Sequence, residues 1–252
     1  MNKYKRSSLI KLKYMLYAYF IFNIQTFNGQ SITEHLKNNT RPSFVKNNLL
    51  PISFIGFGIL LNNSHIEKQL QKTIRKKVGD DFEFKVDNHL LYIPIIQLYA
   101  GAAAGLKTKN NWFNQTKYLI ISNTLTGLVT YGLKQSIQKL RPSNTPHSFP
   151  SGHTSIAFTN ATVLYCEYID SSPTMAYSGF GFSSSTAILR MVNNKHWLSD
   201  VLTGAGLGIL ITKLVYHFEP LKNFNPFKEN ENMILSPQIT TDYYGLFFSL
   251  KF

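Results

Sequence analysis

Cysteine and acidic side chains are scarce in this chain of 252 residues. Cys166 is the only cysteine, which excludes an intrachain disulfide and a cysteine-rich metal site. The 13 acidic residues stand against 26 lysines and arginines, so the formal net charge is +13 and an anionic partner is expected. The sequence also lacks internal repeats and low-complexity tracts, which indicates one domain with extensions at its ends.

Residues 1–30 have the order of a secretory signal, in which basic residues precede an uncharged apolar run over 14–24. We expect cleavage near Asn28-Gly29-Gln30, with an uncleaved N-terminal anchor as the alternative, because the usual pair of small residues is missing there. No acidic residue lies in this segment, so 21 basic and 13 acidic residues, about +8, remain after its removal. The positive surplus is therefore not only a targeting feature.

Uninterrupted apolar runs of the ~20 residues that a membrane-spanning helix needs are missing from the remainder. Six shorter uncharged stretches occur instead, at 49–61, 90–106, 118–133, 154–166, 171–189 and 201–212. Their lengths favour helices, and small residues within them permit close helix contacts. We predict an all-α fold over residues 31–218, a compact bundle of about six helices with its active site at one rim.

The segment 67–87 carries many charges of both signs. We interpret it as a solvated amphipathic helix and loop, because a polyanion-binding surface would lack the acidic residues that accompany the basic ones here.

Residues 219–252 differ in composition from the bundle and begin as a polar linker rich in Asn, Lys and Glu. The last residues alternate between apolar and other side chains, which predicts a short C-terminal β extension. We expect a strand or a hairpin with residues 233–239, packed on the bundle.

Two cations mark the first of three clusters that point to chemistry. Lys134 and Arg141 are seven residues apart, which in a helix ending at Pro142 places them on one face. Arg matches two phosphoryl oxygens and Lys supplies a mobile point charge, so the pair suits phosphate. Alone, it also fits two surface residues that complement a helix dipole.

The second cluster is Pro150-Ser151-Gly152-His153, at the expected start of a helix. Free backbone N–H groups at that position favour an anion, and Gly152 lets an oxygen approach the backbone. His153 is placed to give a proton to a departing oxygen, or it is a helix-terminal histidine without a task.

The third cluster is Arg190 together with His196 and Asp200, which are four residues apart. Asp200 can accept from one ring nitrogen and leave the other free to attack phosphorus. The alternative is an ordinary ion pair on a helix surface. In an up-and-down bundle the four helix ends that carry these clusters share one side, so the clusters are expected to meet at one rim.

These three motifs resemble those of the type 2 phosphatidic acid phosphatase and vanadium haloperoxidase superfamily, in its bacterial envelope phosphatase branch. The pattern there is Lys, six residues, Arg-Pro; then Pro-Ser-Gly-His; then Ser-Arg, five residues, His, three residues, Asp. The resemblance covers roughly 87–218 and departs from the pattern at Leu189, which stands where the family has serine. Loss of that hydroxyl removes one phosphate hydrogen bond, of order ~1 kcal/mol.

The resemblance implies a phosphoric ester hydrolase that forms a phosphohistidine on His196, oriented by Asp200, while His153 protonates the leaving oxygen. It also implies a phosphate cradle made of Lys134, Arg141, Ser151, Gly152 and Arg190. Cations replace Mg²⁺ in this scheme, so we predict no metal and no cofactor. The other histidines lack ligand spacing.

We expect a phosphate monoester or a lipid phosphate or diphosphate as substrate, contact with a membrane surface, and no nucleic acid partner. Two alternatives are a vanadium-dependent haloperoxidase and a non-catalytic protein that binds anionic lipid. We favour export to the periplasm or cell envelope over an integral enzyme with six spans, because six spans would place the rim in the cytosol. Phe149, Trp197 and Trp112 are candidate rim aromatics, with core packing as the simpler interpretation.

Overall fold

The computed structural model describes residues 48–79, 81–218, 220, 221, 224, 233–239 and 244–250. The expected signal segment at 1–30 lies outside these residues, as does most of the linker after 218. The chain divides into two units, Met1–Tyr216 and His217–Phe252, which are described separately.

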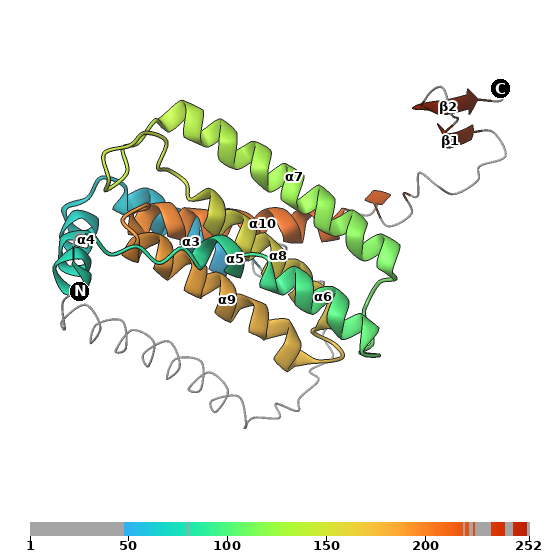
Figure 1. The fold of residues 1–252 in the computed structure, drawn as a ribbon, viewed down its shortest axis with the longest axis horizontal. Coiled ribbons are helices and arrows are strands. Elements are labelled where there is room, and N and C mark those ends of the chain that lie inside the picture. The colour runs from blue at the N-terminus through green and yellow to red at the C-terminus, as the bar shows by residue number, and fades with distance from the viewer. Residues whose placement is uncertain are drawn as a thin grey trace. The chain divides into compact units, whose positions relative to one another are not determined.

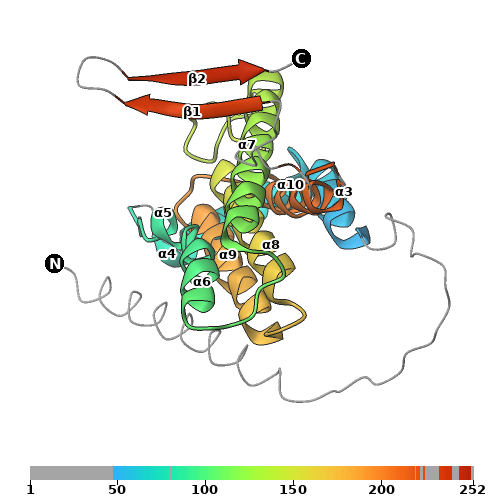
Figure 2. The same ribbon diagram turned by 90° about the vertical axis from the view of Figure 1, so that its right-hand side faces the viewer.

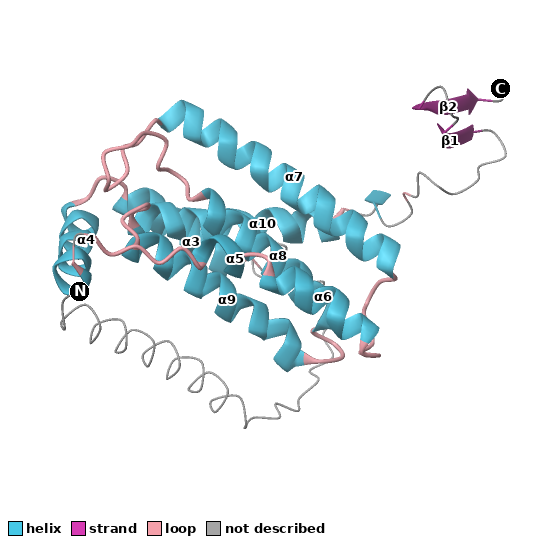
Figure 3. Ribbon diagram, viewed as in Figure 1, coloured by secondary structure: helices cyan, strands magenta, loops and turns pink. Residues whose placement is uncertain are grey.

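The helical unit confirms the predicted all-α bundle (Figures 1 and 3). Its bundle helices are α3 (Leu49–Leu61), α6 (Ile93–Ala103), α7 (Trp112–Ile137), α8 (Gly152–Tyr168), α9 (Pro173–Val192) and α10 (Leu198–His217). Two further helices, α4 (His65–Val78) and α5 (Asp87–Leu90), connect α3 to α6. Figure 2, seen along the bundle, shows α8 surrounded by α7, α9 and α10.

The start of α4 is fixed by its first residues. Ser64 accepts from the backbone N–H of Glu67 (3.2 Å), and Glu67 accepts in return from the backbone N–H of Asn63 (2.6 Å). This reciprocal cap ends α3 and starts α4 at a bend of 90°. As a result α4 lies across one end of the bundle (Figure 1).

Helices α8 and α10 pack closely at two glycines of α10. A Cβ atom added at Gly208 would lie 2.4 Å from the carbonyl oxygen of Ser155, and one added at Gly204 would lie 2.8 Å from that of Ser151. Only glycine permits backbones this close, so these two residues set the separation of the two helices.

At the other end of the bundle, α6, α7, α8 and α9 enclose an apolar cluster that includes Leu98, Leu119, Leu164 and Tyr168. The Tyr168 hydroxyl donates to the carbonyl of Leu98 (2.7 Å). This packing leaves the polar motifs gathered at the opposite end.

Helix α7 is polar on its buried face and apolar on its exposed face. Ser122, Thr126 and Thr130, four residues apart on α7, are buried, while Leu128 and Tyr131 on the same helix are 63% and 64% exposed. On α3, large apolar side chains are likewise exposed, namely Leu49, Leu50, Phe57, Ile59 and Leu60.

By length and composition, α10 is the one helix among the described residues that could cross a membrane. The bent pair α3 and α4 would be a second if it were counted as one span. Because α10 is mostly buried, it also fits the core helix of a soluble protein.

The C-terminal unit contains strands β1 (Met233–Ile239) and β2 (Tyr244–Leu250), which pair antiparallel with Met233 opposite Leu250 and Ile239 opposite Tyr244. The expected packing of such an extension on the bundle stays a prediction.

Candidate active site

The motif-bearing helix ends meet at one end of the bundle, called the rim below, where α7 and α9 end and α8 and α10 begin (Figure 1). The backbone N–H of Ser151 donates to the carbonyl of Asp200 (2.9 Å), which joins the second motif to the third. Lys134 Nζ donates to the carbonyls of His147 (2.8 Å) and Ser148 (3.3 Å), which joins the first motif to the loop before the second. The structure thus brings the three motifs together.

His196 lies just before α10, with its Nδ1 3.3 Å from Oδ2 of Asp200. Because a carboxylate only accepts, Nδ1 carries the proton and Nε2 keeps its lone pair. Burial lowers the pKa of His196 to about 4, although its hydrogen bond to Asp200 acts in the opposite direction. The ring is therefore neutral near pH 7, the form in which Nε2 is a nucleophile.

Asp200 is fully buried in the first turn of α10 and accepts several hydrogen bonds. Its Oδ2 accepts from the Ser148 hydroxyl and from the backbone N–H of Trp197 (2.9 Å), and its Oδ1 from Lys139 Nζ (3.1 Å). Burial raises the pKa of Asp200, but the hydrogen bond from His196 and the charge of Lys139 outweigh burial and lower it. Asp200 is thus an ionised, fixed acceptor.

His153, in the first turn of α8, has its Nε2 3.1 Å from Oδ1 of Asn88 in α5. Burial and then the charge of Arg190 lower the pKa of His153 to about 4, with a partial offset from Asp87. A bound phosphoryl dianion would offset the surrounding cations and raise this pKa, because a nearby opposite charge favours the imidazolium. His153 can therefore gain its proton together with the substrate.

Three cations act electrostatically on this histidine: Lys134, Arg141 and Arg190. Burial and then the neighbouring charge of Arg141 lower the pKa of Lys134 to about 8. Arg190 Nη1 donates to Asp87 (2.8 Å), but the buried Nε atoms of Arg190 and Arg141 have no hydrogen-bond partner among the described residues. Unpaired buried donors beside crowded cations are suited to phosphoryl oxygens.

Arg141 reaches the site by a different route from the predicted one. The expectation that α7 continues to Pro142 is wrong, because α7 ends at Ile137 and Gln138 adopts the left-handed conformation (φ 48°). Arg141 lies in a loop, where its backbone N–H donates to the carbonyl of Thr145 (2.8 Å). The helical spacing of Lys134 and Arg141 is therefore not what makes them converge.

The start of α8 at Gly152 leaves the first N–H groups of the helix without carbonyl partners in the preceding turn, as an anion site requires. The Ser151 hydroxyl is 2.9 Å from that of Thr154. Leu189, the departure from the family pattern, is 1% exposed and belongs to the packed interior.

Besides Ser148, the sequence reasoning missed four residues that contact the motif side chains. Asp87 and Asn88 of α5 contact Arg190 and His153, as described above, and Lys139 contacts both Asp200 and Glu67. A signal existed for Lys139, which lies inside the first motif, but none existed for the three acidic or amide residues.

The interpretation of 67–87 as a solvated segment is wrong at both of its ends. Glu67 and Asp87 are each 1% exposed, because each pairs with a cation of the rim. Unpaired carboxylates would be expelled to solvent, so the ion pairs explain their burial.

Among the residues that the structure describes, no three His, Cys, Asp or Glu side chains group as metal ligands. Metal independence stays a prediction.

Residues 115–224 match the family model described as the PAP2 superfamily, a range that contains every predicted site residue. Glu67, Asp87 and Asn88 lie before it. The chain is similar to the lipid A 1-phosphatase of Porphyromonas gingivalis, 37% identical over 156 residues that make up 60% of this chain. The match covers 34% of that relative, so the chain spans about a third of its length.

Two solved structures are also similar, each at 20% identity. One is the first transmembrane PAP2 type phosphatidylglycerolphosphate phosphatase from Bacillus subtilis, with a TM-score of 0.52 over 71% of this chain and 99% of that one. The other is Aquifex aeolicus LpxE, with a TM-score of 0.48 over 62% of this chain and 98% of that one. At 20% identity, the similarity to the Bacillus subtilis structure shows a shared fold and no more.

Proposed function

We propose that this chain, whose residues 115–224 match the PAP2 superfamily, is a phosphatase of the phosphatidic acid phosphatase type that works through His196. The observation that carries the proposal is the state of this histidine. It is buried and neutral, Nδ1 is held by Asp200, and its pKa responds to the nearby charges of Lys134 and Arg190. A nitrogen nucleophile beside cations fits phosphoryl transfer.

In the first step Nε2 of His196 forms a bond to phosphorus, and the bond from phosphorus to the leaving oxygen breaks. The leaving oxygen keeps the electron pair and takes a proton from His153. In the second step His153 accepts a proton from water, whose oxygen attacks phosphorus and releases inorganic phosphate and free His196. Lys134, Arg141 and Arg190 offset the charge on the phosphoryl oxygens in both steps, the task of Mg²⁺ in other phosphoryl transfer enzymes.

A lipid phosphate is the substrate class that the surface favours. The exposed apolar side chains of α3 and α7, which on α7 lie opposite buried serine and threonines, suit contact with acyl chains better than contact with water. The similar protein from Porphyromonas gingivalis is named a lipid A 1-phosphatase, which agrees with a phosphate on a lipid head group. We therefore infer a membrane-associated envelope enzyme, with the rim on the polar side of the membrane.

Phosphate release from a detergent-solubilised lipid phosphate is the test of this function. The full chain is expected to release phosphate from phosphatidic acid and from a small chromogenic phosphomonoester, with unchanged rates when EDTA is present. Loss of activity in EDTA, restored by a divalent cation, would contradict the metal-free scheme. Absence of release from every substrate would contradict the phosphatase itself, and vanadate loading with bromide and peroxide would then test the haloperoxidase alternative.

A further inference from the structure

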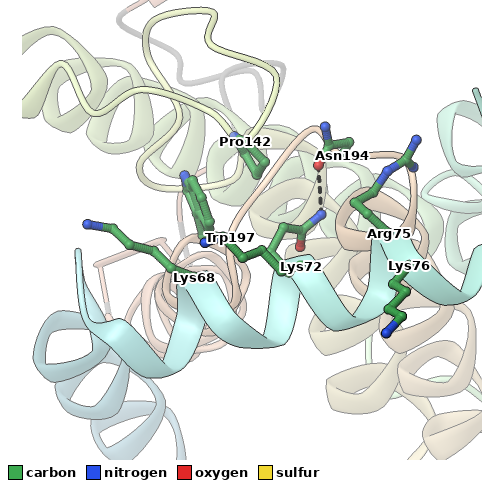
Figure 4. A pocket seen from close by; sticks show the side chains of 8 residues that line it. Lys68, Lys72, Arg75, Lys76, Pro142, Asn194 and Trp197 are labelled. Atoms are coloured by element: carbon green, nitrogen blue, oxygen red, sulfur yellow. Dashed lines mark hydrogen bonds between the residues drawn. The ribbon is translucent and has the colours of Figure 1, made fainter. Parts of the chain in front are cut away.

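A basic cleft of about 620 Å³ adjoins the rim (Figure 4). One wall is α4, and the facing wall is formed by the loops that follow α7 and α9. Its lining residues are Lys68, Gln71, Lys72, Arg75, Lys76, Pro142, Asn194 and Trp197. Pro142 and Trp197 directly follow Arg141 and His196 in the chain, so the cleft lies beside the loops that carry these two motif residues.

Four of the lining residues are cations, and none is acidic. Lys68 and Lys72 are exposed, and their ammonium groups have no hydrogen-bond or ion-pair partner among the described residues. Arg75 is held in place, because it donates to the carbonyls of Phe82 (3.3 Å) and Val192 (2.8 Å). The cleft therefore combines one fixed cation with two available ones.

Three acidic residues of the same segment are occupied elsewhere. Glu83 pairs with Lys195 (3.3 Å), Asp87 with Arg190 (2.8 Å), and Glu67 is buried on the bundle side of α4. Their proximity in the sequence is the reason to expect a solvated amphipathic helix and loop that does not bind a polyanion. In the fold they leave the cleft face of α4 positively charged, so the reason against anion binding no longer applies.

We propose that this cleft is a second anion site, which binds a phosphate carried by the same substrate molecule whose terminal phosphoryl group enters the rim. The proposal rests on the proposed function and narrows it to substrates with two separated phosphates. Two flexible ammonium groups and a fixed guanidinium match the several oxygens of a phosphate. Trp197 and Pro142 line the wall of the cleft that faces α4, and they suit the apolar or sugar part of the head group.

Two non-hydrolysable ligands test the site without turnover. One is hexylphosphonate, and the other is the same compound with a methyl phosphodiester at its far end. Calorimetry is expected to give about tenfold tighter binding of the two-anion ligand, and a smaller ratio as salt is raised. In Lys68→Gln/Lys72→Gln the ratio is expected to fall to about one, with hexylphosphonate affinity unchanged.

The matched control is Lys77→Gln/Lys107→Gln, which removes the same charge from exposed positions outside the cleft. It is expected to keep the wild-type ratio. Equal binding of both ligands by the wild type would overturn the proposal, as would equal weakening of both in the Lys68→Gln/Lys72→Gln variant. The proposal would also be overturned if the Lys68→Gln/Lys72→Gln variant kept the wild-type ratio for the two ligands and lost only its binding to vesicles of anionic phospholipid. That result would assign the cleft to contact with a membrane surface. Calorimetry measures binding and needs no turnover. A protein without phosphatase activity would therefore contradict the proposed function, while the test of the second anion site could still be made.

A second, independent observation concerns Lys139, which is buried behind the nucleophile. Its three ammonium donors are all used, by Glu67 Oε1 (2.9 Å), Ser199 Oγ (2.7 Å) and Asp200 Oδ1 (3.1 Å). The Ser199 hydroxyl in turn donates to Glu67. A cation is thus shared between two buried carboxylates, one of which orients His196.

This contact fixes both ends of the orienting carboxylate. Lys139 holds Oδ1 of Asp200, so Oδ2 is presented to His196 Nδ1. Positive charge grows on the imidazole when Nε2 bonds to phosphorus, and an ionised, correctly turned Asp200 stabilises it. We infer that Lys139 is a positioning residue for the reaction, supported by Glu67 from outside the family match.

Lys139→Met is expected to lower kcat by about 10- to 100-fold with little change in KM, the usual range for a supporting contact. The pH dependence of kcat/KM gives a second readout. Activity needs neutral His196, so it falls as the pH drops through the pKa near 4. Without Lys139 the uncompensated charge of Asp200 favours the imidazolium, so this acidic limb is expected to move to higher pH.

Glu67→Gln/Lys139→Met removes both buried charges and guards against misfolding. This double variant is expected to unfold near the melting temperature of the wild type, while its kcat stays as low as that of Lys139→Met. A double variant with wild-type kcat and an unmoved acidic limb would overturn the inference and leave Lys139 a purely structural ion pair. NMR titration of His196 follows the same shift without turnover, so it separates this outcome from a failure of the proposed function.

Discussion

Replacing His196 with alanine is expected to reduce phosphate release by roughly 10⁴-fold or more, because the variant lacks the atom that bonds to phosphorus. Cations and free N–H groups of the rim remain, so phosphate-ester binding should change little. The measurement is a single-turnover assay with a ³²P-labelled phosphomonoester, quenched in alkali, in which an acid-labile phosphoryl label is expected on the wild-type chain and not on the variant.

His65→Ala is the matched control, because His65 is exposed at the start of α4 and, among the residues that the structure describes, makes no hydrogen bond to a motif residue. It should retain full activity and labelling. A His196→Ala protein that still turns over at a few per cent of the wild-type rate would contradict the covalent scheme and favour direct attack by water.

Replacing His153 with glutamine is expected to have an effect that depends on the leaving group. An alkyl oxygen leaves only with a proton, so hydrolysis of hexyl phosphate should fall by about 10²- to 10⁴-fold. 4-Nitrophenolate leaves without one, so the first step with 4-nitrophenyl phosphate should be nearly as fast as in the wild type. The water step still lacks its base, and a burst of 4-nitrophenol is therefore expected before slow turnover.

Stopped-flow absorbance at the nitrophenolate band measures the burst, and phosphate release measures the steady state. Asn88→Ala serves as the comparison, since Asn88 touches His153 but transfers no proton (Nε2 to Oδ1, 3.1 Å). Equal loss for both leaving groups in His153→Gln would assign His153 to binding instead of proton transfer.

The parts of the site that could be predicted are those whose functional residues lie close together in the chain. His196 and Asp200, like Ser151 to His153, form motifs with a recognisable spacing. The up-and-down order of the helices then brings these motifs to the same end of the bundle. Glu67, Asp87 and Asn88 could not be found this way, because they reach the rim from α4 and α5 through the 90° bend after α3. Charge-rich sequence predicts solvent exposure unless the partner cation is known, and the partners lie more than 60 residues away.

Arg141 shows a different kind of limit. Its convergence with Lys134 was predicted from helical spacing, yet the left-handed Gln138 ends α7 before that spacing applies. Glutamine rarely adopts this conformation, so the sequence gives no warning of the break. That both residues bind one anion stays a prediction, and it now rests on their positions at the rim, Lys134 at the end of α7 and Arg141 in the loop between α7 and α8.

The glycine contact between α8 and α10 has a consequence for how the enzyme can diversify. His153 belongs to α8, and His196 is tied to α10 through Asp200, so the distance between the proposed proton donor and the proposed nucleophile is set by two backbones in contact at Gly204 and Gly208. That distance does not depend on the loops or on α4. Substitutions around the cleft can accordingly change which head group binds, while the distance between His153 and His196 stays the same.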